Sequence, residues 1–202
     1  MKNIILLSLY ICCLSLSKLY AKNNDTSIFY KNEINVFAGY ASWEQTFAVV
    51  GEGLFNFSNL VDTGFSVSTK FIHPVGITYK HYFKKMWCLT SSFSYARTFQ
   101  THTYTNPNFS FKKYDNIFSL MIGAECHYLN KKWVSLYSGL AIGGFLWQNR
   151  VDNKDGINKT VDGYVAFQVN ALGIRVGKRF GGFLELGFGN SGIINGGFSI
   201  KF

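Results

Sequence analysis

Hydrophobic and polar residues alternate with a period of two through most of the chain after residue 33. This is the period of a β-strand, whose successive side chains point to opposite faces. Leu120 and Ile122 alternate with Ser119 and Gly123 in the middle of the chain. The final segment alternates most cleanly, with Phe198, Ile200 and Phe202 on one face. The pattern therefore predicts a protein built almost entirely of strands.

The alternating segments predict about eight strands, at residues 33–41, 74–84, 87–99, 115–129, 133–147, 163–177, 180–190 and 193–202. Short basic turns at 84–86, 130–132 and 178–179 alternate with longer polar connections at 42–73, 100–114 and 148–162. Short turns at one end and long loops at the other are typical of outer-membrane barrels. We therefore predict an all-β fold, an antiparallel up-and-down transmembrane β-barrel of about eight strands.

Two segments depart from the simple pattern. In the sixth strand the apolar residues change phase, from Phe167 and Val169 to Leu172 and Ile174. One extra residue near Asn170-Ala171, a β-bulge, would restore the facing; a wrong assignment of the outer face is the alternative. The first long external loop, 42–73, contains apolar residues at roughly helical spacing, which is compatible with a short helix there.

Charged residues on the face opposite the apolar one are predicted to line the barrel interior. They are Lys80, Glu125, Arg175, Glu185 and Lys201. We expect Arg175 and Glu185 to make contact, because a tight turn joins their strands. An interior of about eight strands is just wide enough for side chains to fill, which favours a salt-bridged structural network. A narrow polar conduit is the alternative.

The first 21 residues resemble an export signal. Lys2 precedes an apolar run that is too short to span a membrane, and Ala21 is a small residue at a plausible cleavage site. Residues 22–202 then form the barrel domain. Cys12 and Cys13 leave with the signal, whereas Cys88 and Cys126 remain. Strand phase places these last two on opposite faces, so we predict thiols rather than a disulfide.

The composition suits a sheet protein in an apolar environment, with 15% charged residues, 18% aromatic residues and 20 glycines in 202 residues. The net charge of +9 does not indicate nucleic-acid binding, because no basic face with stacking aromatics stands out. The cations gather instead at the short turns, as Lys84, Lys85, Lys131, Lys132, Lys178 and Arg179. Beside them, an aromatic girdle of Trp87, Tyr128, Trp133, Phe180 and Phe202 is predicted at the lipid interface.

The chain resembles the small outer-membrane β-barrel proteins of Gram-negative bacteria, the porin-like OmpA/OmpX-like class. The resemblance rests on the signal segment, the hairpin 183–192 and the terminus Gly197-Phe198-Ser199-Ile200-Lys201-Phe202. It implies a bacterial outer-membrane location. It also implies that Phe198, Ile200 and Phe202 form a C-terminal signal read by the barrel-assembly machinery.

We expect a monomer, in contact with outer-membrane lipid, with a structural or surface-interaction role and a side-chain-filled lumen. The alternative is a narrow porin for small solutes; less favoured are a soluble lipocalin-like ligand binder and a lipid-modifying enzyme. We predict no catalytic residues, since no His-x-Ser pair stands on a strand. His73, His81, His102 and His127 show no metal-ligand spacing within one element, so no metal site and no cofactor is predicted.

Overall fold

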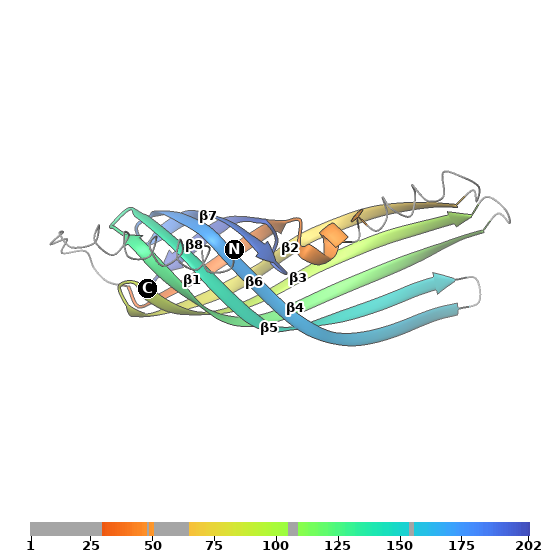
Figure 1. The fold of residues 1–202 in the computed structure, drawn as a ribbon, viewed down its shortest axis with the longest axis horizontal. Coiled ribbons are helices and arrows are strands. Elements are labelled where there is room, and N and C mark those ends of the chain that lie inside the picture. The colour runs from red at the N-terminus through yellow and green to blue at the C-terminus, as the bar shows by residue number, and fades with distance from the viewer. Residues whose placement is uncertain (1–29, 48, 51–64, 105–108, 154–155) are drawn as a thin grey trace, which may run out of the picture.

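The computed structural model describes residues 30–47, 49–50, 65–104, 109–153 and 156–202. They form one closed antiparallel barrel in which each strand pairs with its chain neighbours and β1 pairs with β8 (Figure 1). The strands are β1 (Asn32–Tyr40), β2 (Phe65–Lys84), β3 (Trp87–Tyr104), β4 (Phe109–Asn130), β5 (Val134–Asn153), β6 (Gly156–Gly177), β7 (Phe180–Gly189) and β8 (Ile194–Lys201). The predicted eight-stranded barrel is confirmed. The predicted signal peptide, 1–21, lies outside the described residues.

The five central strands are longer than the sequence pattern predicts. The loops predicted at 100–114 and 148–162 are wrong in large part, because β3 continues to Tyr104, β4 starts at Phe109, and β5 and β6 fill most of 134–177. The segment 65–73, assigned to the first loop, also belongs to a strand, β2. The physical reason is that strands projecting beyond a membrane carry polar residues on both faces. The pattern therefore assigns these polar parts of the strands to loops.

The barrel is closed over only part of its length. The pairing of β1 with β2 ends at Ala38 and Val75, and the pairing of β6 with β7 ends at Gln168 and Gly189. Beyond these pairs, β2–β6 continue alone as a curved five-stranded extension (Figure 1). The C-terminus lies at the opposite end, where the short turns are.

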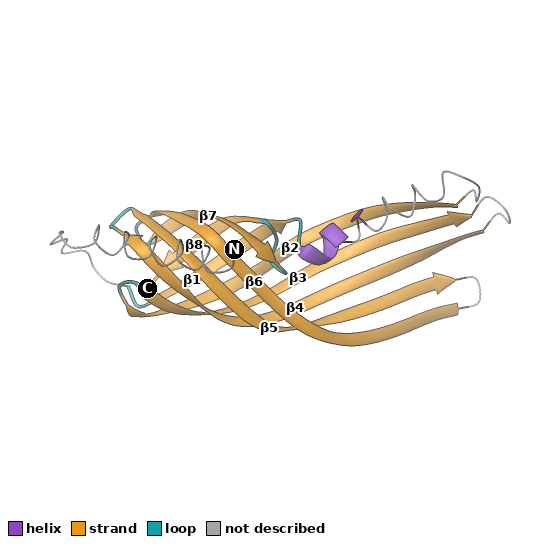
Figure 2. Ribbon diagram, in the orientation of Figure 1, coloured by secondary structure: helices purple, strands orange, loops and turns teal. Residues whose placement is uncertain are grey.

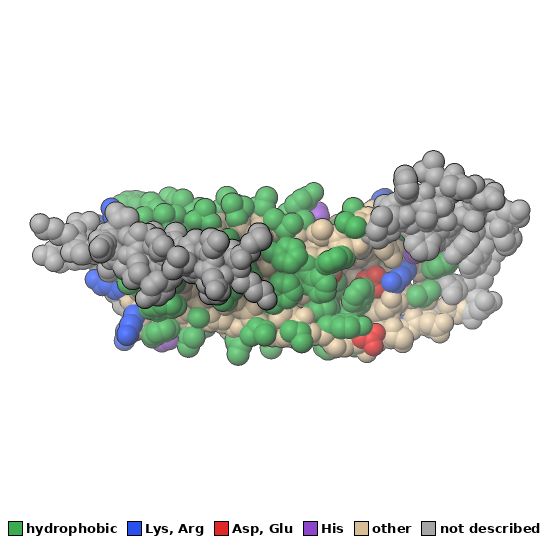
Figure 3. All heavy atoms as spheres, in the orientation of Figure 1, with side chains coloured by type: hydrophobic (Ala, Val, Ile, Leu, Met, Phe, Trp, Pro, Cys, Tyr) green, Lys and Arg blue, Asp and Glu red, His purple; other side chains and the backbone are tan. Residues whose placement is uncertain are grey.

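The outside of the closed part is apolar. Leu120, Ile122, Leu140 and Ile142 are all more than half exposed, and hydrophobic side chains are numerous on the part of the barrel wall that is visible in Figure 3. Of the predicted girdle, Trp87, Trp133, Phe180 and Phe202 are also exposed, near the short turns. The Lys178 ammonium lies 4.4 Å from the centre of the Trp133 ring. This is the outward-facing belt of a membrane-spanning barrel. None of the described helices is long and apolar enough to cross a membrane.

The β-bulge in β6 is confirmed. The register between β5 and β6 shifts between Tyr137 and Gly139 of β5, and the register between β6 and β7 shifts between Asn170 and Leu172 of β6. Both shifts occur at the same place along β6. On both sides β6 has the extra residue, and the Ser138 hydroxyl donates a 2.6 Å hydrogen bond to the Ala171 carbonyl. The bulge returns Leu172 and Ile174 to the outer face, as the phase change predicts.

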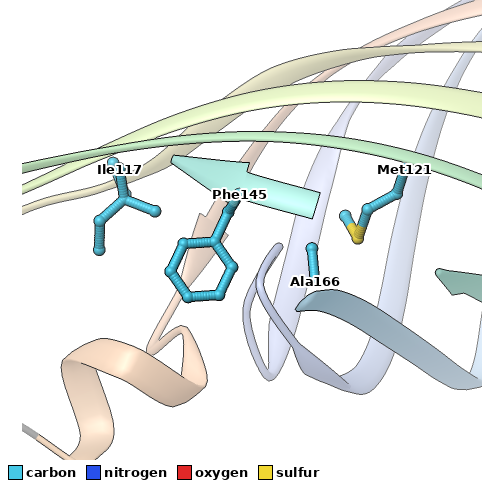
Figure 4. Close-up of a cluster of buried hydrophobic side chains, with 5 residues drawn as sticks. Ile117, Met121, Phe145 and Ala166 are labelled. Carbon is cyan, nitrogen blue, oxygen red and sulfur yellow. The ribbon is translucent and has the colours of Figure 1, made fainter. Parts of the chain in front are cut away.

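A short helix closes the inner space at the mouth of the barrel. The chain is helical at residues 43–47 and 49–50, within the segment where the sequence allows a helix (Figure 2). Trp43 packs at this level against an apolar cluster on the inner face, which consists of Ala96, Ile117, Met121, Phe145 and Ala166. Figure 4 shows labelled members of the cluster on the side of the sheet where the helix lies. The interior is therefore filled with apolar side chains at this level.

Candidate functional site

All five charged residues predicted for the lumen lie inside the barrel and are at least nine-tenths buried. Lys80 of β2 is at the centre. Its ammonium lies 2.8 Å from both carboxylate oxygens of Glu125 and 3.5 Å from Glu185. A buried charge is costly unless it is paired and hydrogen-bonded. The structure brings these three residues together from β2, β4 and β7, so the contacts tie distant parts of the wall together.

The contact expected between Arg175 and Glu185 is replaced by another. The Arg175 guanidinium lies 3.2 Å from Glu33 of β1, and it donates to Ser199 and to carbonyls of the adjoining turn. The register explains the difference. Glu185 is paired with Gly173, whereas Arg175 is paired with Phe183, nearer the turn. Arg175 therefore reaches across to β1 and β8, while Glu185 faces Lys80.

Glu33 is the main network residue that sequence reasoning missed. It is 1% exposed and also lies 3.7 Å from Lys201, and it accepts a 2.7 Å hydrogen bond from the Tyr82 hydroxyl. Its position at the start of the first alternating segment was the available signal. With Glu33 included, the acids Glu33, Glu125 and Glu185 balance the bases Lys80, Arg175 and Lys201, three against three.

Tyr137 fills the space beside this network. Its hydroxyl donates a 2.7 Å hydrogen bond to Glu185, and the Lys80 ammonium lies 4.3 Å from the centre of its ring. Gly173, on the neighbouring strand, makes room for the ring. A Cβ at that position would lie 2.4 Å from a Tyr137 ring carbon, far below an ordinary contact. The glycine is therefore required by packing, and the lumen is filled at this level.

The helix at the mouth is held to the barrel wall by polar contacts. Glu44 accepts a hydrogen bond from Asn190, in the turn between β7 and β8, and Gln45 donates one to the Ile72 carbonyl. Burial raises the pKa of the Glu44 carboxyl from 4.5 to about 7, because water is excluded around it. The same turn is anchored by the Ser191 amide, which donates to Gln168. Helix and turn together cover the interior.

The C-terminal strand completes the ring. Ile34 pairs with Ile200, and the backbone of Phe202 exchanges two hydrogen bonds with that of Asn32. Phe198, Ile200 and Phe202 are all exposed on the outer face, as the alternation predicts. Their role as an assembly signal stays a prediction.

Of the two cysteines on β3 and β4, Cys88 faces the interior, fully buried, and Cys126 is partly exposed. They form no disulfide with each other. Cys88 and His127 are interior residues that sequence reasoning did not bring together, because they stand on different strands. The alternation places both side chains on the inner face, and this was the only indication in the sequence that they could lie close together.

A closed eight-stranded ring, an apolar outer belt and a paired, buried set of charges inside define a small β-barrel of the outer-membrane type. No protein-family model matches the chain, and no curated protein matches it.

Two solved structures of Ail, the attachment invasion locus protein of Yersinia pestis, are similar to this chain. In the complex of Ail with the heparin analogue sucrose octasulfate, the identity is 12% and the TM-score 0.42, over 85% of this chain and 96% of that one. In the other structure, the identity is 11% and the TM-score 0.43, over the same shares. The assignment of this chain to the outer-membrane type of barrel rests on its closed ring of strands, its apolar outer belt and the paired charges inside.

Proposed function

We propose that this protein is an integral outer-membrane barrel with a closed interior, which holds a surface-interaction sheet outside the cell. The observation that carries the proposal is the unequal length of the strands. β2–β6 continue well past the point where β1, β7 and β8 end. A barrel that only needed to span the membrane would not require this extension.

The packing of the interior supports a closed rather than a conducting barrel. Buried ion pairs between Lys80 and Glu125 and between Arg175 and Glu33 cross the lumen near the short turns. Trp43 and the apolar cluster occupy the mouth. An interior of eight strands has room for such side chains and little else. In this proposal the protein is neither a porin nor an enzyme.

The edges of the extension support an interaction role. No described strand pairs with β2 before Val75 on its β1 side, or with β6 before Gln168 on its β7 side. An unpaired edge presents backbone N–H and C=O groups that can add a strand from another chain. We propose that a partner docks on this part of the molecule by strand addition, and that the barrel itself is a monomer.

The membrane and the assembly machinery are the remaining proposed partners. Outer-membrane lipid would surround the apolar belt, and the C-terminal strand ending at Phe202 would be read during assembly. Deleting Phe202 should lower the yield of folded barrel in the outer membrane while leaving export intact. Cell fractionation with a heat-modifiability gel measures both.

Planar-bilayer recording of the refolded protein tests the closed interior. We expect no steady channel openings from a protein that migrates as a folded, heat-modifiable barrel. Reproducible single-channel steps from that same preparation would overturn the closed-lumen proposal and favour a narrow porin.

Amide hydrogen exchange tests the interaction role. In the purified protein, residues 67–73 of β2 and 158–165 of β6 should exchange faster than β4, which is paired on both sides. In native outer-membrane vesicles a partner strand would slow exchange at one of these edges. Equal exchange in both preparations would contradict strand addition.

A further inference from the structure

Three side chains with metal-binding atoms meet in the lower part of the barrel interior. Cys88 is the second residue of β3, and Glu125 and His127 stand two residues apart on β4, with Cys88 and Glu125 directly paired. All three are buried, Cys88 and His127 completely. They lie close to the short turns, at the end of the barrel that would face the periplasm.

The distances between their binding atoms match those around a tetrahedral zinc ion. Cys88 Sγ lies 3.6 Å from Glu125 Oε2 and 3.6 Å from His127 Nε2, and those two atoms are 3.2 Å apart. Zinc bonds of about 2.3 Å to sulfur and about 2.0–2.1 Å to nitrogen and oxygen, at tetrahedral angles, separate the ligands by about 3.6 Å and about 3.3 Å. The three atoms therefore already form one face of such a site.

We propose that Cys88, Glu125 and His127 bind a zinc ion as its three protein ligands. A thiolate, an imidazole and a carboxylate are a ligand set that suits zinc and cobalt, whereas magnesium and calcium prefer oxygen ligands alone. Sequence spacing gave no metal site here because the ligands come from two strands. The inference does not depend on the proposed surface role.

The surroundings hold two of the ligands in place. The His127 ring lies between Tyr82 and Tyr137, at centroid distances of 5.0 Å and 4.7 Å. The Lys80 ammonium contacts both oxygens of Glu125. In the metal-bound state the lysine keeps its contact with Oε1 and gives up Oε2 to zinc, so that it still orients the carboxylate, as outer-shell partners of metal ligands do.

Binding is an exchange of a proton for the metal ion. The Cys88 thiol loses its proton to solvent, and its sulfur forms the zinc–sulfur bond. The zinc ion is the only co-reactant, and no oxidation occurs. The site gains one positive charge overall, in a compartment where the six surrounding charges balance.

Cobalt titration of the whole chain, refolded in detergent, tests the proposal. We expect stoichiometric Co²⁺ binding with a thiolate-to-cobalt absorption band that added Zn²⁺ removes and added Mg²⁺ does not. C88S and H127Q should lose the band while migrating as folded barrels. C126S, which changes the cysteine on the other face, is the matched control and should keep it. A wild-type protein without the band, or a C88S protein that retains it, would overturn the proposal.

Thiol protection gives an answer that does not require C88S to fold. In C126S protein, Cys88 is the thiol within the barrel, and a maleimide can be applied during refolding with and without Zn²⁺. We expect Zn²⁺ to slow the modification of Cys88. Equal modification with and without Zn²⁺ contradicts the site.

Discussion

Replacing Ile122 by arginine should destabilise the folded barrel by about 2–4 kcal/mol, the cost of a cation on the lipid face at the bilayer midplane. Ile122 is 67% exposed on the outer face of β4. It stands six residues along the strand from Tyr128, which lies at the short-turn end of β4, the end where the girdle residues are. A rise of about 3.4 Å per residue at a tilt of about 40° places it about 16 Å from the girdle, within a belt about 25 Å tall.

Val161 provides the matched control. It is 61% exposed on the same outer side, on β6. It stands 16 residues from Gly177 at the short-turn end, or about 40 Å by the same rise and tilt, which is above the belt. V161R should therefore change the stability by less than about 1 kcal/mol.

Urea titration of folding into lipid vesicles, followed by gel mobility and tryptophan fluorescence, measures both variants against the wild type. The difference between I122R and V161R depends only on depth in the bilayer, because both replace an exposed apolar residue by the same cation. Equal costs for the two variants, or none for I122R, would refute the assignment of the belt.

Three further predictions concern the interior and the mouth. K80M should destabilise the barrel by about 3–5 kcal/mol because it leaves Glu125 buried without its cation. The double variant K80M/E125Q should recover part of this loss in urea titration. If the double variant loses as much stability as the two single variants together, or more, the pairing is contradicted. G173A should cost more than about 1 kcal/mol in the same assay, since its Cβ meets the Tyr137 ring, and wild-type stability would show that the ring moves freely. Because docking raises the pKa of Glu44 from 4.5 to about 7, docking of the helix at the mouth is fully stabilised below pH about 4.5 and this contribution is lost as the pH rises past 7. Limited proteolysis of the first loop should therefore speed up as the pH rises from about 4.5 to about 7 in the wild type, level off above that, and show no such pH dependence in E44Q; an identical pH profile in both would exclude this carboxyl as the cause.

The particular pairings inside the barrel could not be predicted from the sequence. The inward phase of Lys80, Glu125, Arg175, Glu185 and Lys201 follows from alternation, and all are buried inside. Which acid meets which base depends on register and on side-chain direction. Arg175 turns toward the short turn and Glu33, a contact between the sixth strand and the first. A period-two pattern carries no information about such cross-barrel neighbours.

The length of the strands could not be predicted from the sequence pattern either. Alternation marks a strand only where one face meets lipid and the other meets the interior. In the extension both faces of β2–β6 carry polar residues, as at the adjacent Arg97 and Thr98 of β3 and Asn149 and Arg150 of β5. The hydrogen-bonded register, and not the hydrophobic pattern, keeps these residues in strands.

Alternation along the sequence predicts the class of fold, the number of strands, the bulge in β6 and the face that meets lipid. Each of these follows from the local period of side chains along an extended chain. The folded barrel is needed to show where β1, β7 and β8 end, which charges pair, and that Cys88 approaches His127. Those features depend on how strands far apart in the sequence are aligned when the ring closes, and closure is a property of the whole sheet.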